Sequence, residues 1–200
     1  MLEVNNITIE RKGNLLYKNL SFKVEPGKLL HLKGMNGSGK SSLLQALIGD
    51  LRPKEGEVLV DGKMVKSARE IAREFGYLPQ ELKIDFPISV HEYLLLAKPK
   101  KDITRILNLL DLENLKDKKI TEISLGQLQR VQFAQLLVQN PNIFLLDEPF
   151  SAQDDFKKGI ILGILEDLKK DQKMVILTHH LQMEIVKIVD QTIELKVNPI

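Results

Sequence analysis

Gly34-Met35-Asn36-Gly37-Ser38-Gly39-Lys40-Ser41-Ser42 is a glycine-rich run that ends in Gly-Lys-Ser-Ser. It matches the P-loop pattern, in which Gly, four residues and Gly-Lys precede Ser or Thr. An apolar run, residues 29–32, leads into it, and a helical pattern, residues 41–49, leads out of it. A loop of this kind between a strand and a helix points backbone N–H groups inward and holds a di- or triphosphate. The sequence therefore predicts a nucleoside-triphosphate site rather than a glycine- and serine-rich loop with an unrelated lysine.

The P-loop supplies most of the expected nucleotide contacts. Lys40 brings a positive charge to the β- and γ-phosphates, and the Ser41 hydroxyl is expected to ligate Mg²⁺. The loop positions expected to bind the nucleotide are Asn36, Gly37, Ser38, Gly39, Lys40, Ser41 and Ser42.

Length and composition bound the class of protein. The chain has 200 residues, 43% of them apolar, which is enough for one domain with a substantial core and an inserted subdomain. Its 29 basic and 27 acidic residues are mixed along the sequence and give a net charge of +2, so no nucleic-acid partner is expected. The absence of cysteine fits a reducing cytosol. No apolar run is long enough to span a bilayer and the first residues are not basic, so neither a membrane span nor a secretory signal is expected.

The first third of the chain has the pattern of strands around the P-loop helix. Residues 2–9 fit a strand with one irregular step, and residues 20–24 alternate strictly between apolar and polar before a Pro-Gly turn. Asp61-Gly62 joins residues 58–60 to residues 63–65 and predicts a tight hairpin. We therefore expect a small antiparallel element beside the nucleotide-binding strand and helix.

Helical patterns fill the middle of the chain, and an α/β pattern resumes after them. Residues 103–110 and 128–137 carry apolar side chains at helical spacing. Residues 143–146 and 174–177 are continuous apolar runs, typical of strands buried on both faces, and residues 156–168 between them have an amphipathic helical pattern. Alternating strands and helices predict a parallel sheet, in which ligands bind at the carboxyl ends of the strands.

The predicted fold is therefore α/β: a P-loop NTPase (RecA-like) core with a small antiparallel β subdomain and an inserted α-helical subdomain. We expect a single domain over residues 1–200. Its core is expected at about residues 1–80 and 141–200, and its helical subdomain at about residues 81–140.

Polar side chains follow the two buried runs. Asp147 and Glu148 come directly after residues 143–146, and His179 comes directly after residues 174–178. Because Mg²⁺ prefers oxygen ligands, Asp147 at a strand end is expected to be a metal ligand. Glu148 is placed to accept a proton from the water that attacks the γ-phosphate. We expect His179 to contact the γ-phosphate, since imidazole donates a hydrogen bond without a permanent charge, with a purely structural histidine as the alternative.

Gln80 lies at the junction between the expected core and the helical insert. A glutamine there can contact Mg²⁺ or water through its side-chain carbonyl while its loop moves. By itself it is an ordinary surface glutamine, so its interpretation depends on the other motifs.

Together these motifs resemble those of the nucleotide-binding subunit of an ABC transporter. The stretches that carry the resemblance are residues 34–42, Gln80, Ile123-Ser124-Leu125-Gly126-Gln127, Phe144-Leu145-Leu146-Asp147-Glu148-Pro149, Ser151-Ala152-Gln153-Asp154 and Thr178-His179. The match runs over nearly the whole chain. The resemblance implies Mg²⁺-dependent ATP hydrolysis with catalytic roles for Glu148, His179, Gln80 and Lys40, and with Ser41, Gln80 and Asp147 at the metal.

The resemblance also implies that Ser124, Gly126 and Gln127 contact ATP bound to a second copy of the chain. A P-loop leaves the far side of the γ-phosphate open, and something must shield it from water and stabilise its developing charge. The Ser124 hydroxyl and the amides at the start of the helix of residues 126–139 suit this role, because the helix dipole favours an anion there. Two copies related by a two-fold axis complete both sites, so a homodimer is expected on ATP binding.

The chain departs from the family pattern in several places. Leu125 replaces the first glycine of the Leu-Ser-Gly-Gly-Gln signature and is expected to weaken the contact between copies or to slow hydrolysis. Gln153 stands where leucine is usual and Gln135 where arginine is common. The usual adenine-stacking aromatic residue is absent near Arg11, whose guanidinium is expected to stack instead, while Tyr17 is too far along the chain to serve. None of these changes removes a catalytic group, so an active ATPase is expected.

The implied function is energy coupling for membrane transport. A separate transmembrane permease subunit is the expected partner, at the cytoplasmic face of the inner or plasma membrane, with residues 81–96 as the docking surface. The alternative is a soluble ABC ATPase of cofactor assembly, while a non-hydrolysing switch is disfavoured because Glu148 is present. The opening third resembles haem-exporter ATPases of cytochrome c maturation and the middle, residues 76–90, resembles zinc or manganese uptake ATPases. The substrate is therefore open between haem and a divalent metal.

Overall fold

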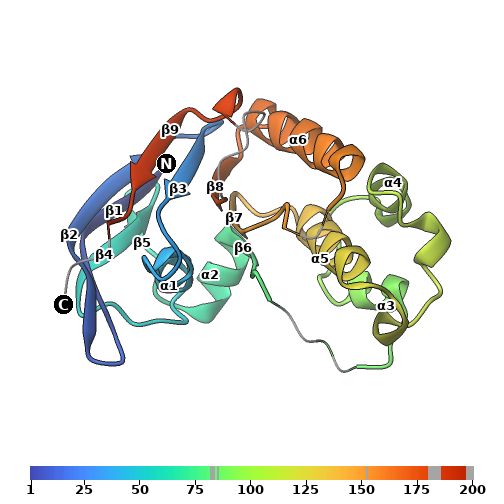
Figure 1. Ribbon diagram of the computed structural model, residues 1–200, viewed down its shortest axis with the longest axis horizontal. Helices are drawn as coiled ribbons and strands as arrows, with labels where there is room; N and C mark the ends of the chain where they lie inside the picture. The colour runs from blue at the N-terminus through green and yellow to red at the C-terminus, as the bar shows by residue number, and fades with distance from the viewer. Residues whose placement is uncertain (82–83, 85, 152, 180–185, 197–200) are drawn as a thin grey trace.

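Two β-sheets and a set of helices make up the structure, a computed structural model (Figure 1). It describes residues 1–200 except 82–83, 85, 152, 180–185 and 197–200. The antiparallel sheet lies at one end of the molecule, most of the helices lie at the other, and the parallel sheet stands between them (Figure 1). This arrangement is the α/β fold that the sequence predicts.

The parallel sheet carries the strands that the sequence marks as fully buried. Its strand order is β6-β7-β8-β3-β9. The strands are β3 (Leu29–Lys33), β6 (Phe75–Leu78), β7 (Ile143–Asp147), β8 (Met174–Thr178) and β9 (Gln191–Glu194). Every residue of β7 and β8 is buried, because helices or the second sheet cover both faces. The register pairs Asp147 with Thr178, so the polar residues that end these two central strands lie side by side.

The antiparallel sheet has the strand order β2-β1-β4-β5. Its strands are β1 (Leu2–Arg11), β2 (Asn14–Val24), β4 (Glu55–Val60) and β5 (Lys63–Met64). The expected hairpin is present: Asp61 and Gly62 have φ of 50° and 72°, as a tight turn with two left-handed residues requires. β1 keeps its pairing with β2 through more than one register shift, where the sequence suggested a single irregular step.

Six α-helices complete the described fold. They are α1 (Lys40–Leu47), α2 (Ala68–Glu74), α3 (Val90–Leu95), α4 (Ile103–Leu109), α5 (Leu125–Gln139) and α6 (Asp155–Lys170). Short 3₁₀ turns, η1 (Glu113–Leu115) and η2 (Ile120–Glu122), link α4 to α5. The helices α3, α4 and α5 fall between β6 and β7, inside the predicted insert, although the exact limits of the subdomains stay a prediction.

Two apolar clusters hold the layers together, one on each face of the parallel sheet. Along β7, Phe144 and Leu146 join the cluster formed with α3 to α6, whereas Ile143 and Leu145 join the cluster formed with α1 and the antiparallel sheet. This alternation follows from the two-residue period of a strand. The P-loop helix α1 is thereby packed against the sheet whose carboxyl ends carry the acidic residues.

Candidate functional site

The P-loop curls at the amino end of α1, and the side chain of Tyr17 packs against it. Gly39, the residue before α1, has φ of 86°, a backbone conformation that favours glycine. The Tyr17 ring lies against Gly39, so that a side chain there would collide with it. The Tyr17 hydroxyl donates a hydrogen bond to the Ser38 carbonyl. Burial raises the pKa of Tyr17 above its ordinary value of 10.0, so the hydroxyl keeps its proton.

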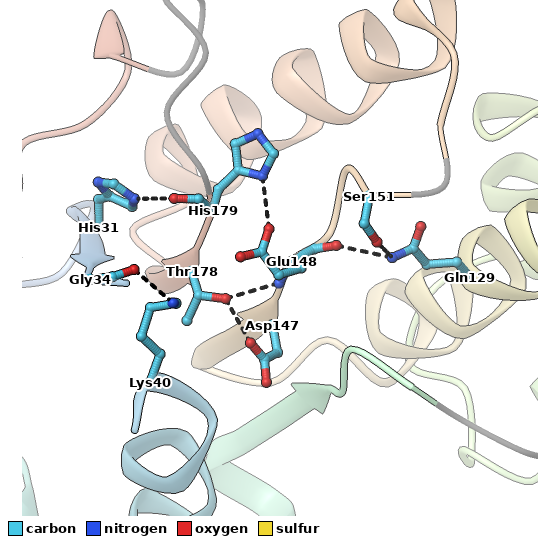
Figure 2. A network of polar contacts seen from close by, with 9 residues as sticks. All are labelled: His31, Gly34, Lys40, Gln129, Asp147, Glu148, Ser151, Thr178 and His179. Carbon is cyan, nitrogen blue, oxygen red and sulfur yellow. Dashed lines mark hydrogen bonds and ion pairs between the residues drawn. The ribbon is translucent and has the colours of Figure 1, made fainter. Parts of the chain in front are cut away.

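Lys40 extends back along the loop rather than into solvent. Its Nζ donates to the Gly34 carbonyl at 2.9 Å (Figure 2). It also donates to the Met35 carbonyl at 3.2 Å. The side chain is largely buried. A buried ammonium group held between loop carbonyls is ready to meet an anion at this point.

A pocket of about 430 Å³ opens over the P-loop. Its lining brings together distant parts of the chain: the turn between β1 and β2, the P-loop, Gln80 and the end of β7. The described lining residues are Arg11, Lys12, Asn14, Leu16, Asn36, Gly37, Gly39, Lys40, Ser41, Ser42, Gln80, Asp147 and Glu148. The pocket thus collects most of the residues that the sequence assigns to one site, with hydroxyl, amide and carboxylate oxygens facing a basic loop.

Thr178 links the two acids at the end of β7. Its hydroxyl donates to Asp147 Oδ1 at 2.6 Å and accepts from the Glu148 backbone N–H at 3.0 Å (Figure 2). The Thr178 carbonyl also accepts from the same N–H, at 3.2 Å. A single buried hydroxyl therefore fixes the Asp147 carboxylate and the chain direction at Glu148 together.

Glu148 is held in a backbone conformation that costs free energy. Its φ is 53°, in the left-handed region that non-glycine residues rarely adopt, and its side chain is buried. Such a conformation persists only where the surroundings enforce it, and it is typical of functional sites. His179 Nδ1 donates to Glu148 Oε2 at 3.1 Å, and the Phe150 ring packs edge-on against the imidazole at 5.1 Å. The carboxylate is thus directed by contacts to both its backbone and its side chain.

His31 connects β3 to the same histidine. Its Nε2 donates to the His179 carbonyl at 3.0 Å (Figure 2). Burial is the main reason that the pKa of His31 lies below its ordinary value of 6.5, so the ring is neutral at neutral pH. The strand that leads into the P-loop therefore anchors the backbone next to Glu148.

Arg11 and His179 have surroundings that the sequence did not specify. Arg11 Nη1 donates to Ser42 Oγ at 2.9 Å at the rim of the pocket, and its stacking on adenine stays a prediction. His179 contacts Glu148 and is not among the described residues that line the pocket, so its contact with a γ-phosphate also stays a prediction.

The signature residues lie at the start of α5, away from this pocket. Ser124 Oγ accepts from the Gln127 N–H at 3.3 Å, and Gln127 Oε1 accepts from the Ser124 N–H at 2.9 Å, which makes a capping box. Leu125 is 69% exposed at the first position of the helix. The described lining of the pocket includes none of Ser124, Gly126 and Gln127. Their contact with the nucleotide of a second copy is compatible with this position and is not tested by it.

Sequence reasoning missed several residues of the site. Thr178 was noted only as part of a motif, and Tyr17 was considered only for stacking on adenine. His31 is a polar residue that interrupts an apolar run, and this interruption is the signal that could have identified it. Gln129 gave no such signal, because its carbonyl partner at Glu148 is set by tertiary structure.

No helix in the described part of the chain is long and apolar enough to cross a bilayer.

Comparison with known proteins agrees with this geometry. A model of the ABC transporter family matches residues 17–151, more than half of the chain. The "Probable ABC transporter ATP-binding protein in ycf23-apcF intergenic region" of Cyanophora paradoxa is 35% identical over 90% of this chain and 78% of its own length. The manganese transport system ATP-binding protein MntB of Halalkalibacterium halodurans is 30% identical over 98% of this chain and 82% of its own.

A solved structure of the ATP-binding subunit of an ABC transporter has the same fold. It superposes with a TM-score of 0.89 at 22% identity, covering 98% of this chain and 88% of that chain. The expected P-loop NTPase fold is therefore confirmed, as is the resemblance drawn from the motifs. This chain belongs to the ABC transporter family and is one of its ATP-binding, ATP-hydrolysing subunits.

Proposed function

We propose that this chain powers a membrane transporter by hydrolysing ATP at the pocket over the P-loop, with Glu148 as the general base. The observation that carries the proposal is the arrangement at the end of β7 and β8, where Thr178 and His179 hold Asp147 and Glu148 at the edge of the pocket. The two adjacent acids differ in their contacts, as two acids with different tasks require.

Glu148, Lys40 and His179 each have a role in the proposed hydrolysis. The Glu148 carboxylate accepts a proton from a water molecule, whose oxygen attacks the γ-phosphorus. The bond between the γ-phosphorus and the β–γ bridging oxygen breaks, and ADP and phosphate form. Lys40 stabilises the charge on the phosphates from the loop side. His179 orients Glu148 through Nδ1, and its buried Nε2, which has no hydrogen-bond partner among the described residues, supports a contact with the γ-phosphate when nucleotide is bound.

The residues present fit Mg²⁺ with the nucleotide. Ser41 and Asp147 both line the pocket and offer the oxygen ligands that Mg²⁺ prefers, and Gln80 lines it as well. When held by these residues, Mg²⁺ would supply positive charge that neutralises the charge developing on the phosphates. Thr178 keeps Asp147 in place for this role, because its hydroxyl already donates to Oδ1.

A second copy of the chain would complete the site. Ser124, Gly126 and Gln127 stand at the amino end of a long helix, whose dipole favours an anion, and the side chain of Leu125 beside them is exposed. We infer that these residues cover the γ-phosphate bound by the other copy, so that ATP holds two copies together and hydrolysis releases them.

The relatives support a proposal for the partner and the substrate. We propose that a separate transmembrane permease subunit binds this protein at the cytoplasmic face of the membrane, and that the transported substrate is a divalent metal rather than haem. The similarity over nearly the full chain to the ATP-binding protein of a manganese transport system supports the metal. Residues 81–96 are the proposed docking surface, with residues 82, 83 and 85 outside the described part of the chain.

The Glu148→Gln variant tests the core of the proposal. Glutamine keeps the size of the side chain but accepts no proton at neutral pH, so turnover is expected to fall about a hundredfold or more. ATP is then trapped, and sedimentation velocity with Mg-ATP should show a shift from monomer to dimer that is absent without nucleotide. Glu166→Gln on the exposed face of α6 is the matched control and should hydrolyse ATP at the wild-type rate.

Two outcomes would contradict parts of the proposal. Wild-type turnover of Glu148→Gln would remove Glu148 as the base, and a variant that stays monomeric with Mg-ATP would count against the completion of the site by a second copy. Purification from membranes tests the partner: recovery of a soluble assembly scaffold instead of a polytopic protein would support the cofactor-assembly alternative. In proteoliposomes with the permease, stimulation of ATPase activity by haem rather than by Mn²⁺ or Zn²⁺ would overturn the metal.

A further inference from the structure

Two buried glutamine side chains form a hydrogen-bonded chain between α5 and the backbone of Glu148. Gln129 belongs to the second turn of α5, and Gln153 lies in the segment just before α6. Both side chains are almost fully buried. Buried primary amides are costly unless their hydrogen bonds are made, so the partners they find define what they hold together.

Arg130 determines which amide atoms donate and which accept in this series of hydrogen bonds. A guanidinium group can only donate, so the contact of 3.3 Å between Arg130 Nη1 and Gln153 requires Oε1 of Gln153 as acceptor. Gln153 Nε2 then donates to Gln129 Oε1 at 2.8 Å and to the Gly126 carbonyl at 3.1 Å. Each amide in the series therefore accepts on its oxygen and donates from its nitrogen, an arrangement in which neighbouring hydrogen bonds strengthen one another.

The series of hydrogen bonds ends on the backbone carbonyl of Glu148. Gln129 Nε2 donates to the Glu148 carbonyl at 3.1 Å and to Ser151 Oγ at 3.3 Å (Figure 2). On the other side of the same residue, the Glu148 N–H is bound by Thr178 of β8. The left-handed backbone of Glu148 is thus fixed from the sheet at its nitrogen and from α5 at its carbonyl.

We propose that Gln153 and Gln129 are positioning residues that transmit the position of the first turn of α5 to Glu148. This inference rests on the proposed role of Glu148 as the base. Gln153 binds the carbonyl of Gly126 in that first turn, and Gln129 binds the carbonyl of Glu148, so a displacement of the turn changes the orientation of the carboxylate. Leucine, which is usual at the position of Gln153 in the family, makes neither hydrogen bond.

The consequence is coupling between two nucleotide sites. In a dimer, the first turn of α5 in one copy covers the nucleotide of the other copy, while Glu148 acts on the nucleotide of its own. The two glutamines connect the first turn of α5 to Glu148 within one chain. Closure of that turn over the nucleotide of the other copy therefore also aligns Glu148 with the nucleotide of its own copy.

The Gln153→Leu variant tests the inference by steady-state ATPase kinetics. We expect kcat to fall about tenfold, as for one hydrogen bond lost in the transition state, with KM for ATP unchanged because no lining residue of the pocket is altered. Gln153→Glu is the sharper variant: it still accepts from Arg130 but cannot donate to Gln129 or Gly126, and kcat should fall by a similar factor. Gln135→Leu is the matched control, because Gln135 also lies on α5 and donates to a backbone carbonyl, that of Tyr93, remote from the site.

A double-mutant cycle separates positioning from a merely structural role. Gln129→Leu with Gln153→Leu should lower kcat no further than either single change, because both break the same series of hydrogen bonds. Independent effects of the two changes on kcat, or wild-type kcat in Gln153→Glu, would overturn the inference. Sedimentation of the Glu148→Gln protein keeps the two proposals distinguishable: ATP-driven dimers of Glu148→Gln together with wild-type kcat in Gln153→Leu would refute only the positioning role.

Discussion

His31 is a buried polar side chain between Leu30 and Leu32 of β3, and among the described residues its ring makes a hydrogen bond only through Nε2, to the carbonyl of His179. The unfolded chain takes up a proton at this ring near pH 6.5, whereas the folded protein resists protonation because burial lowers the pKa of His31. Below about pH 6.5 the chain therefore takes up a proton at His31 when it unfolds. The free energy of unfolding then decreases as the pH falls, until the lowered pKa of His31 in the folded protein is reached. Above that window the histidine contributes no pH dependence.

His31→Gln should remove this part of the pH dependence. Glutamine can donate to the His179 carbonyl as Nε2 does, and it does not titrate. We expect the urea midpoints of the nucleotide-free wild type and the variant to run parallel above pH 7 and to diverge between pH 6.5 and 5, where the wild type loses more stability. Midpoints that stay parallel down to pH 5 would show that the ring is protonated as easily in the folded protein as in the unfolded chain.

Elements with one strong local signal could be predicted from the sequence, and those that depend on tertiary contacts could not. The P-loop, α1, β7 and β8 follow from glycine spacing and from apolar runs, and the hairpin at Asp61 follows from its turn residues. The helix α2 was not predicted, because it is short and none of its residues is fully buried, although Ser67 and Glu70 form a capping box at its start. The strand β6 was not predicted either, since it is short and contains glycine.

The same distinction holds for the site. Lys40, Asp147 and Glu148 were identified because their residue types follow a loop or a strand of recognisable pattern. The hydrogen bonds that Thr178 and Gln129 make to them depend on the register between β7 and β8 and on the packing of α5, which no local pattern encodes.

At the first turn of α5, the Leu125→Gly variant tests whether Leu125 limits hydrolysis. Because its side chain is mostly exposed, Leu125→Gly removes little buried surface, and its cost to helix stability is at most about 1 kcal/mol. We expect kcat to rise roughly three- to tenfold if the leucine prevents one backbone N–H from reaching phosphate. Leu125→Ala is the control for size alone, since alanine keeps helix propensity. An unchanged kcat in both variants would show that the larger side chain is tolerated.

At the scale of the whole molecule, three of the ten large apolar side chains that are exposed among the described residues lie in the proposed docking surface. They are Phe86, which precedes α3, Leu95 at the last position of α3 and Leu96 directly after it. The helix α3 lies at the end of the molecule opposite the antiparallel sheet (Figure 1). Residues of this kind are typical of protein interfaces.

Phe86→Ser should weaken the permease complex without affecting the nucleotide site. We expect recovery of the membrane subunit with the tagged protein to fall about tenfold, as for the loss of an aromatic anchor, while ATPase activity of the isolated protein is unchanged. Phe156→Ser on α6 is the matched control, because Phe156 is 73% exposed against 70% for Phe86 and lies outside residues 81–96. Equal recovery with Phe86→Ser and with the wild type would place the docking surface elsewhere.

Tyr17 gives the protein an optical property of its own. The chain has no tryptophan and three tyrosines, so ultraviolet emission comes from tyrosine alone. One of these rings lies beneath the P-loop, with its hydroxyl bound to the Ser38 carbonyl. Any phosphate that reshapes the loop alters this hydrogen bond and with it the brightness of the ring. We therefore expect the tyrosine emission of the unlabelled protein to change when nucleotide binds, and to stay unchanged in Tyr17→Phe.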